Sequence, residues 1–290
     1  MAKNVFWWKP FGNFSDAKVS LYRYHQAWTY LALKNRNFSN FGDALNKDVM
    51  EFLSGDSVLW SPLDKADYIS VGSVIDIAEK SDFSGLILGC GVRDESIKLS
   101  RLNTSNIKAV RGYLSANIVN GDNSIAYGDP GLLAREIYNP SKHIHGGKKP
   151  LLIPHFNVFN SGDGRKKVKA IASEGWDVAF TNISAEAMAE KIYNASFVAS
   201  SSLHGIIFAD SFGIPSQLVD FGLSTNREPI FKYNDYYSVF GITASFAPVD
   251  QVVNRPLGQL ISQKEEHLEK ISQNIDSIIE KLYSLRNYIN

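Results

Sequence analysis

Short apolar runs alternate with amphipathic stretches along most of this chain. Residues 86–88 and 107–110 are mainly apolar runs, too short for a buried helix and typical of buried parallel strands. Residues 44–53 repeat apolar side chains at helical spacing, and Ser184 is a candidate N-cap for a second helix over residues 185–194. Strands that alternate with helices favour an α/β fold. Further strands are expected at residues 4–8, 68–71, 125–127, 151–153, 176–180, 197–199 and 217–220.

The clearest unit lies in residues 196–220, which predict a strand, a tight turn, a helix and a second strand. Serines at residues 200–202 are candidate N-caps for a largely apolar helix over residues 203–212. Gly213 and Pro215 end that helix before the second strand begins. The unit therefore places a helix N-terminus at the carboxyl end of a buried strand.

This strand-to-helix corner is a candidate anion site. His204 falls in the first helical turn, where backbone N–H groups lack partners and the helix dipole favours an anion. Gly205 removes a side chain where a ligand could approach. We therefore expect phosphate or carboxylate to bind at Ser202, Leu203, His204 and Gly205. The alternative is that His204 is a satisfied polar residue at a helix start.

Asp43 precedes the predicted helix over residues 44–53 and has two interpretations. As an N-cap it is structural, and as a carboxylate in a cleft it accepts a proton from a hydroxyl. Asn40 and Gly42 lie beside it and are expected on the same cleft.

Arg111 directly follows the strand at residues 107–110, and Ser115 lies at the start of the next helix. A guanidinium there binds carboxylate or phosphate in a bidentate way, or else pairs with a carboxylate of its own domain. Arg93, after the cluster Gly89 to Gly91, either faces the cleft or pairs locally. The glycine clusters lack the full dinucleotide-binding fingerprint.

Composition narrows the function classes. The chain has 290 residues, with 30 basic and 30 acidic side chains that cancel, which argues against a nucleic-acid-binding protein. The single Cys90 excludes an internal disulfide framework. No stretch is long enough to span a bilayer, and the first ten residues are too short and too soon interrupted for a signal peptide. We expect a soluble cytoplasmic protein, with peripheral contact at the inner face of the plasma membrane left open.

Residues 139–150 are poor in large apolar side chains and predict a linker between a domain over residues 1–140 and a domain over residues 150–290. His143 and His145 lie in the linker, and His155 follows the next strand. Without a carboxylate or thiol cluster beside them, no metal site is expected.

Apolar residues near the C-terminus predict a long amphipathic helix. We expect it to lie across both domains; a coiled coil is the alternative, and a homo-oligomer is left open. The aromatic-rich residues 20–33 leave a hairpin or a short helix open. The apolar positions of the terminal helix are Leu268, Ile271, Ile275, Ile278, Leu282, Leu285 and Ile289.

Taken together, several short motifs resemble the polysaccharide pyruvyl transferase family, in that family's order. The strongest is the run from Ser202 to Gly205, with Ala209 and the run Gly213 to Pro215 after it. The supporting motifs are Asn40 to Asp43, Val110 to Gly112 with Ser115, Asp129 with Pro130, Pro154 with His155, and Phe231 with Lys232 followed by Tyr236 and Tyr237.

The resemblance implies two Rossmann-like domains that face a cleft, as in GT-B glycosyltransferases. It also implies phosphoenolpyruvate as donor and a saccharide diol, free or lipid-linked, as acceptor, with a cyclic pyruvate ketal as product of capsule, exopolysaccharide or cell-wall glycan synthesis. No cofactor is implied. The anion-binding Arg and the His of the family's motif correspond to Arg111 and His204.

This chemistry needs cations for the donor, an acid and a base. Arg111 and the helix N-terminus at Leu203 are expected to hold phosphoenolpyruvate. His204, with a pKa near neutral, is expected to protonate the donor methylene. Asp43 and His155 are the candidate bases, and Asn40, Gly42, Arg93 and Ser115 are expected on the acceptor side.

Two alternatives remain from the sequence. A GT-B glycosyltransferase would hold the diphosphate of a nucleotide sugar at the same helix N-terminus, with an acidic residue on the ribose that the sequence does not reveal. A non-catalytic partner in a polysaccharide assembly complex would use the terminal helix as a docking face.

Overall fold

The computed structural model describes residues 2–9, 14–35, 39–120, 125–140, 149–223 and 228–289. Within these residues, the N-terminal half forms a six-stranded parallel sheet in the order β2-β1-β3-β4-β5-β6. The α/β architecture expected from the sequence is confirmed. The strands are β1 (Lys3–Val5), β2 (Val58–Trp60), β3 (Tyr68–Ile69), β4 (Leu86–Leu88), β5 (Ile107–Val110) and β6 (Ala126–Tyr127).

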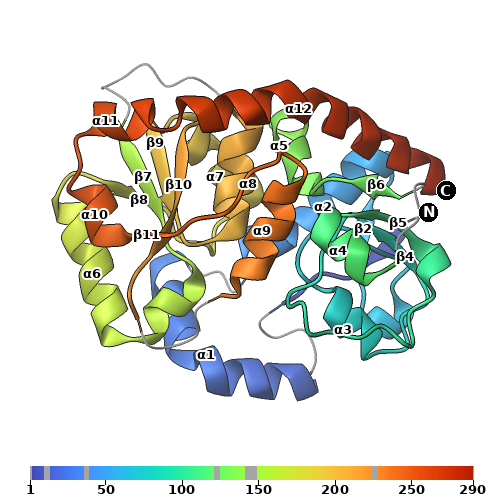
Figure 1. Cartoon of the computed structure of the whole chain (residues 1–290). Helices are drawn as coiled ribbons and strands as arrows, with labels where there is room; N and C mark the ends of the chain where they lie inside the picture. The colour runs from blue at the N-terminus through green and yellow to red at the C-terminus, as the bar shows by residue number, and fades with distance from the viewer. Residues whose placement is uncertain are drawn as a thin grey trace.

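The C-terminal half forms a second parallel sheet, in which five strands of the described part are ordered β11-β10-β9-β7-β8. Figure 1 shows the two sheets side by side with helices around both. These strands are β7 (Pro150–Ile153), β8 (Asp177–Val178), β9 (Phe197–Ser200), β10 (Ser216–Asp220) and β11 (Ala247–Pro248).

Helices connect the strands of both sheets. The α-helices are α1 (Phe14–Asn35), α2 (Phe41–Ser54), α3 (Ile75–Glu79), α4 (Tyr113–Ile118), α5 (Ala134–Ile137), α6 (Gly162–Ser173), α7 (Ala185–Tyr193), α8 (Leu203–Ser211), α9 (Ile230–Ser238), α10 (Val249–Val253), α11 (Leu257–Ser262) and α12 (Glu265–Tyr283). The 3-10 helices are η1 (Leu63–Lys65), η2 (Thr104–Asn106), η3 (Pro130–Leu133), η4 (Phe156–Asn160) and η5 (Ser284–Tyr288).

In each sheet, the order in which successive strands are added reverses once. After β1 the chain adds β2 on one side and then β3 to β6 on the other; after β7 it adds β8 on one side and then β9 to β11 on the other. A crevice opens at the carboxyl ends of the strands where the order reverses, and ligands of open α/β sheets bind there. In the C-terminal sheet this point lies between β7 and β9.

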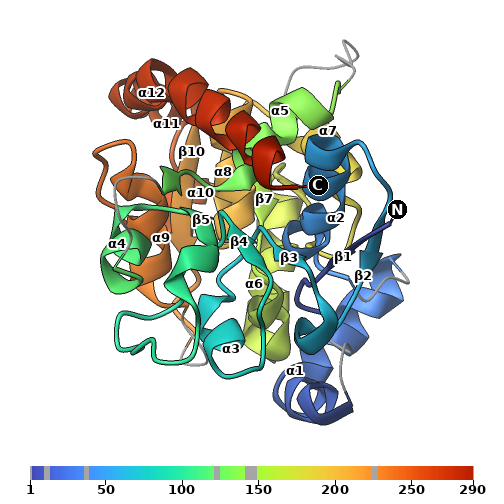
Figure 2. The same cartoon turned by 90° about the vertical axis from the view of Figure 1, so that its right-hand side faces the viewer.

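Two helices tie the halves together. α1, from the N-terminal half of the sequence, packs against η4 of the C-terminal half, where the Trp28 and Phe156 rings stack with centroids 5.2 Å apart. α12 contacts α8 beside one sheet and both β6 and η3 beside the other. Figure 1 shows α12 running along the top of both halves, and Figure 2 shows the C-terminus beside α2.

One apolar core crosses from one half to the other. It joins Phe41 and Leu45 of α2 to Ile207 and Phe208 of α8. The Phe41 and Phe208 rings meet edge to face with centroids 5.5 Å apart. Phe41 begins α2 and also contacts the His204 ring in the first turn of α8, so this packing brings the two helix N-termini together.

Several local expectations are confirmed or corrected here. Gly55 ends α2 in a left-handed conformation, and Ser184 caps α7. The aromatic-rich segment at residues 20–33 is helical, as part of α1. Asp43 as an N-cap is wrong, because Asn40 caps α2 by accepting a hydrogen bond from the Gly42 backbone N–H. The predicted linker lies mostly at residues 141–148, outside the described residues.

Candidate functional site

The N-termini of α2 and α8 meet at His204. The Gly42 backbone packs directly on the imidazole, since a Cβ at this position would lie well inside van der Waals contact with Nδ1. Phe41 meets the same ring edge to face with centroids 6.3 Å apart. His204 Nε2 is buried and has no hydrogen-bond partner among the described residues. An unpaired buried nitrogen of this kind is typical of a catalytic or binding group or of local strain.

The environment of His204 keeps the ring neutral. Burial lowers its pKa to about 3, and the positive charges of Lys232 and Arg111 act in the same direction. The near-neutral pKa expected from the sequence is therefore wrong for the unliganded protein. A bound anion would reverse the electrostatic part of this shift, because negative charge favours the imidazolium.

The reversal point of the C-terminal sheet holds His155. It follows β7, and its backbone N–H donates to Ser201 Oγ at 2.8 Å, which joins the ends of β7 and β9. Its Nδ1 accepts a hydrogen bond from the Asn157 backbone N–H at 3.4 Å. Burial lowers the pKa of His155 to about 4 although the Glu228 charge opposes this. His155 is thus a second neutral imidazole beside His204.

Ser202 and Gly205 have structural roles in the turn into α8. Ser202 occupies the N-cap position, but no capping bond from its side chain is present in the described part of the chain. Ser200 Oγ instead organises the turn by accepting from the Ser202 backbone N–H and donating to the Ser202 carbonyl. Gly205 faces Ser200 Oγ and the Ile153 side chain, so a Cβ there would clash with the sheet. The absent side chain permits close packing of helix on strand, not the ligand approach that we expected.

Three charged side chains form a cluster at the mouth of the site. Glu228 accepts from Arg93 Nη2 at 3.1 Å and from Lys232 Nζ at 2.7 Å. Burial alone would raise the pKa of Glu228, but the positive charges of Lys232 and Arg93 hold it well below its ordinary value. Arg93 comes from the N-terminal half and is 44% exposed, whereas Lys232 is buried on α9. The cluster therefore links the two halves and includes one cation that solvent can reach.

Asp43 is half-buried in the first turn of α2, with Oδ1 turned toward the Gly72 loop. Burial raises its pKa to about 7; the charges of Lys232 and Arg93 oppose the rise and the Glu228 carboxylate supports it. A carboxyl group with this pKa is both a competent acid and a competent base at neutral pH. Among the predicted site residues, Asp43 rather than His204 therefore has the near-neutral pKa.

Arg111 is paired inside the protein. Its Nε donates to Asp235 Oδ2 at 2.9 Å, and both side chains are fully buried. Its other donors reach Ser73 Oγ at 2.6 Å and the Val92 carbonyl at 2.7 Å. The guanidinium thus pairs with a carboxylate, as one alternative from the sequence held, but the carboxylate comes from α9 of the C-terminal half and not from the domain of Arg111.

The residues expected on the acceptor side divide into two groups. Ser115 is buried, donates to Asp235 Oδ2 at 2.6 Å and accepts from the Val92 backbone N–H at 2.9 Å. Asn40 and Gly42 are buried in the α2 cap. Only Arg93 of the four presents an exposed polar group to the cleft.

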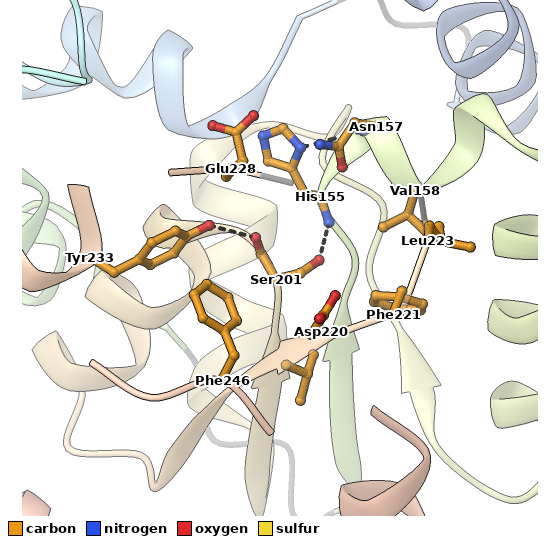
Figure 3. Close-up of a pocket in the computed structure, with 11 residues that line it drawn as sticks. His155, Asn157, Val158, Ser201, Asp220, Phe221, Leu223, Glu228, Tyr233 and Phe246 are labelled. Atoms are coloured by element: carbon orange, nitrogen blue, oxygen red, sulfur yellow. Dashed lines mark hydrogen bonds between the residues drawn. The ribbon is translucent and has the colours of Figure 1, made fainter. Parts of the chain in front are cut away.

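A pocket lies beside the charged cluster, at the carboxyl ends of β7, β9 and β10 (Figure 3). His155 and Glu228 stand at one end of it, and Asp220 and Phe246 lie farther along. Tyr233 Oη donates to the Ser201 carbonyl at 2.9 Å and closes one wall. The remaining lining residues are Asn157, Val158, Val219, Phe221 and Leu223.

Sequence reasoning missed Glu228 and Asp235. Glu228 and Lys232 are four residues apart at a helix start, a spacing that suggests an ion pair but says nothing of Arg93. Asp235 gave no local signal, because its partner Arg111 lies 124 positions away. In the described ranges, no group of three or more metal-ligating side chains is present and no helix is long and apolar enough to cross a membrane. His143 and His145 lie outside these ranges.

Comparisons with known proteins identify one family and two relatives. The sequence model described as polysaccharide pyruvyl transferase matches residues 10–220, which include Asp43, Arg111, His155 and His204. An uncharacterised protein of Acanthamoeba polyphaga mimivirus is 31% identical over 217 residues, 70% of this chain and 71% of that protein. The succinoglycan biosynthesis protein ExoV of Rhizobium meliloti (strain 1021) is 26% identical over 209 residues, which cover 70% of this chain and 62% of ExoV.

Proposed function

The chain belongs to the polysaccharide pyruvyl transferase family, and from this we propose that it transfers a pyruvyl group from phosphoenolpyruvate to a saccharide diol. The product is a cyclic ketal, and the other product is phosphate. The observation that carries this proposal is the set of groups near the first turns of α2 and α8: the cations Arg93 and Lys232, the neutral imidazole of His204 and the Asp43 carboxyl group with a pKa of about 7.

In this proposal Arg93, Lys232 and the first turn of α8 bind phosphoenolpyruvate. Phosphoenolpyruvate carries nearly three negative charges, so it needs several cations and N–H donors. Both cations are paired with Glu228, but each retains further N–H donors for a ligand, and the Arg93 side chain is 44% exposed. The α8 N-terminus adds backbone N–H groups and the positive end of the helix dipole.

The first chemical step is addition across the donor double bond. An acceptor hydroxyl oxygen bonds to C2 of phosphoenolpyruvate while Asp43 takes the hydroxyl proton. The electron pair of the double bond takes a proton from His204 at C3 and forms the methyl group. The negative charge of the bound donor raises the pKa of His204 from its unliganded value of about 3, so that the ring carries the proton when it is needed.

The second step completes the ketal. Phosphate leaves C2 with the electron pair of the C–O bond, and the second hydroxyl of the acceptor bonds to C2. His155, a neutral imidazole on the pocket side, takes the proton of that hydroxyl. Over both steps one diol and one phosphoenolpyruvate give one ketal and one phosphate.

Arg111 has a supporting role in this scheme. The resemblance gives it the anion-binding function, but its guanidinium is buried and paired with Asp235. Direct contact with phosphoenolpyruvate would require this pair to open, which leaves a buried carboxylate without its partner. We therefore assign donor binding first to Arg93 and Lys232, and to Arg111 the positioning of α9, which carries Lys232.

Calorimetric titration with phosphoenolpyruvate tests the donor site. Lys232→Met should weaken binding at least tenfold, since it removes a charge-assisted contact to the ligand. Lys270→Met is the matched control, because Lys270 pairs with Glu266 at 2.8 Å within α12. Unchanged affinity in Lys232→Met would refute the assignment. Phosphate release from phosphoenolpyruvate that requires an added saccharide would establish the transfer.

A nucleotide-sugar glycosyltransferase is a second candidate, favoured by one observation. Asp220 ends β10, directly after the β9-α8 unit, where acidic residues of dinucleotide-binding folds hold a ribose. The sequence alone did not reveal this residue in that role. Calorimetric binding of UDP in preference to phosphoenolpyruvate would favour this candidate.

A further inference from the structure

Ser73 carries a polar group beside the candidate site that the proposed reaction does not use. It lies in the loop after β3, and its Oγ accepts a hydrogen bond of 2.6 Å from Arg111 Nη1. We propose that the Ser73 hydroxyl donates to an anionic oxygen of phosphoenolpyruvate, so that Arg111 acts on the donor through Ser73 without leaving Asp235. The identity of the ligand rests on the proposed function, whereas the unused hydroxyl hydrogen is a feature of the structure.

The contact with Arg111 does not exhaust the hydrogen-bonding capacity of Ser73. A serine hydroxyl has one hydrogen to donate and two lone pairs with which to accept. Arg111 occupies a lone pair, and the hydrogen has no acceptor among the described residues. Ser73 is half-buried, so its hydroxyl is neither enclosed in the core nor fully surrounded by solvent. A substrate oxygen is therefore able to accept this hydrogen.

The contact with Arg111 favours an anion as that acceptor. A hydrogen bond from a charged donor draws electron density from the Ser73 oxygen and makes its hydrogen a stronger donor. The Arg111 side chain is fully buried, and its Nε and Nη2 are held by Asp235 and by the Val92 carbonyl. Although Asp235 offsets the charge of Arg111 at longer range, the Nη1 N–H still polarises the hydroxyl that it touches.

The backbone places Ser73 next to groups already assigned to the reaction. The loops after β3 and β4 lie side by side, because the Gly91 backbone N–H donates to the Gly72 carbonyl at 2.9 Å. The second loop continues to Arg93, the exposed cation assigned to the donor. Asp43 Oδ1 lies 3.7 Å from the point that a Cβ on Gly72 would occupy. Because Ser73 directly follows Gly72, an oxygen bound to it brings the donor beside the carboxyl group assigned to the acceptor hydroxyl.

Calorimetric titration with phosphoenolpyruvate, and separately with inorganic phosphate, tests this contact. Ser73→Ala should weaken binding about tenfold, as expected for loss of a hydrogen bond to a charged group. Ser73→Thr keeps the hydroxyl and should recover most of the affinity. Ser81→Ala is the matched control, since it removes a half-buried hydroxyl of the same half that is bonded to the Ala78 carbonyl at 2.8 Å. Unchanged affinity in the folded Ser73→Ala variant overturns the proposal.

A labelling measurement separates contact with the ligand from an indirect effect on Arg111. Cys90 is the single cysteine of the chain and is buried, so the Ser73→Cys variant carries one accessible thiol. Phosphoenolpyruvate at about ten times its Kd should slow the reaction of this thiol with methyl methanethiosulfonate about tenfold, because few molecules remain unliganded. The Ser81→Cys variant should react equally fast with and without the ligand. No labelling of the Ser73→Cys variant, or labelling that the ligand does not slow, overturns the proposal.

The two ligands distinguish failure of the Ser73 contact from failure of the proposed donor. If inorganic phosphate binds in a Ser73-dependent way and phosphoenolpyruvate does not bind, the anion contact stands and the proposed donor is wrong. If phosphoenolpyruvate binds equally well to the unmodified chain and to Ser73→Ala, the donor stands and the role of Ser73 is wrong. If neither anion binds, both are wrong.

Discussion

The backbone of Gly42 lies directly against the imidazole of His204, with no room for a side chain between them. Gly42 stands in the first turn of α2, and His204 stands in the first turn of α8. The two helices come from different halves of the chain and are joined by the Phe41 and Phe208 contact. The position of the candidate acid is therefore set by the glycine of another helix.

Gly42→Ala should displace His204 and disable the site. The added methyl group overlaps Nδ1 and Cγ of the imidazole, so either the ring or α2 must move. Overpacking of this kind costs about 1–3 kcal/mol of unfolding free energy. We expect that loss in chemical denaturation, together with loss of turnover.

Gly258→Ala provides the control for this change. Gly258 lies in α11 with open space around its Cα, so alanine should leave turnover unchanged and the stability unchanged or slightly higher. Full activity of Gly42→Ala would contradict the proposed placement of His204.

Asp43→Asn should stabilise the protein above neutral pH. The folded pKa of Asp43 is raised from 3.8 to about 7, so between these values the unfolded state loses its proton first. The unmodified protein therefore loses stability as the pH rises through this window, and the neutral amide does not. At pH 8 the variant should be more stable by about 1–3 kcal/mol in urea denaturation. The difference should vanish below about pH 4, and a constant difference across the range would show that Asp43 keeps an ordinary pKa.

The same residue predicts the pH profile of turnover. If Asp43 takes the hydroxyl proton, kcat/KM should rise as the pH passes about 7, since the carboxylate form is the active one. In Asp43→Asn this rising limb should disappear along with most of the activity. Asp177→Asn, an exposed carboxylate, should retain the normal profile. A falling limb at this pH would instead make Asp43 the acid.

Arg111 and Asp235 should behave as a coupled buried pair. Arg111→Met leaves the Asp235 carboxylate buried without its cation, which costs about 3–5 kcal/mol of unfolding free energy. The double variant with Asp235→Leu should lose much less than the sum of the single changes, because no buried charge remains. Denaturation of the four proteins measures this coupling.

A separate measurement addresses the role of Arg111 in binding. For the stability measurement, the control is Arg101→Gln, which breaks an exposed pair with Asp82 and should change the free energy of unfolding by less than about 0.5 kcal/mol. For the binding measurement, the folded double variant is titrated with phosphoenolpyruvate. If the folded double variant still binds phosphoenolpyruvate, Arg111 is a positioning residue. If it folds and binds none, Arg111 contacts the donor as the resemblance implies.

Ile278→Ala should destabilise the whole molecule through α12. Ile278 is buried in the core shared by both halves, and its Cγ2 packs on Gly128 beside the N-terminal sheet. Removal of three carbon atoms from such a core costs about 2–4 kcal/mol. Ser277→Ala, one position away on the exposed face, should cost less than about 0.5 kcal/mol. Equal thermal unfolding midpoints for the two variants would show that α12 does not stabilise the body of the protein.

Features that depend on residues close together in the chain were predicted from the sequence. The β9-α8-β10 unit and the Ser184 cap of α7 depend on residues a few positions apart, and each was predicted close to its observed place. The apolar spacing of the last helix likewise matched the buried face of α12. Periodicity and capping act within one or two turns of chain, so they are present in the sequence before any fold exists.

Where the sequence offered two equally suitable interpretations of a residue, only the tertiary structure decided between them. Asn40 and Asp43 both suit an N-cap, and burial of Phe41 and Gly42 against α8 started the helix earlier and made Asn40 the cap. The Arg111 guanidinium can bind either an anionic ligand or a carboxylate of the protein. In the structure it pairs with Asp235 of α9.

The charge states of the site were likewise beyond the sequence. His204 has an ordinary side chain, but burial and nearby cations lower its pKa to about 3, while burial raises that of Asp43 to about 7. Desolvation and the sum of charges depend on every neighbour that the fold brings within a few ångströms. The sequence by itself therefore determined most of the strands, the helices α2, α7, α8 and α12, and the strand-to-helix corner of the candidate site. Only the packing of the two halves determined which groups there are paired, which are neutral and which are open to a ligand.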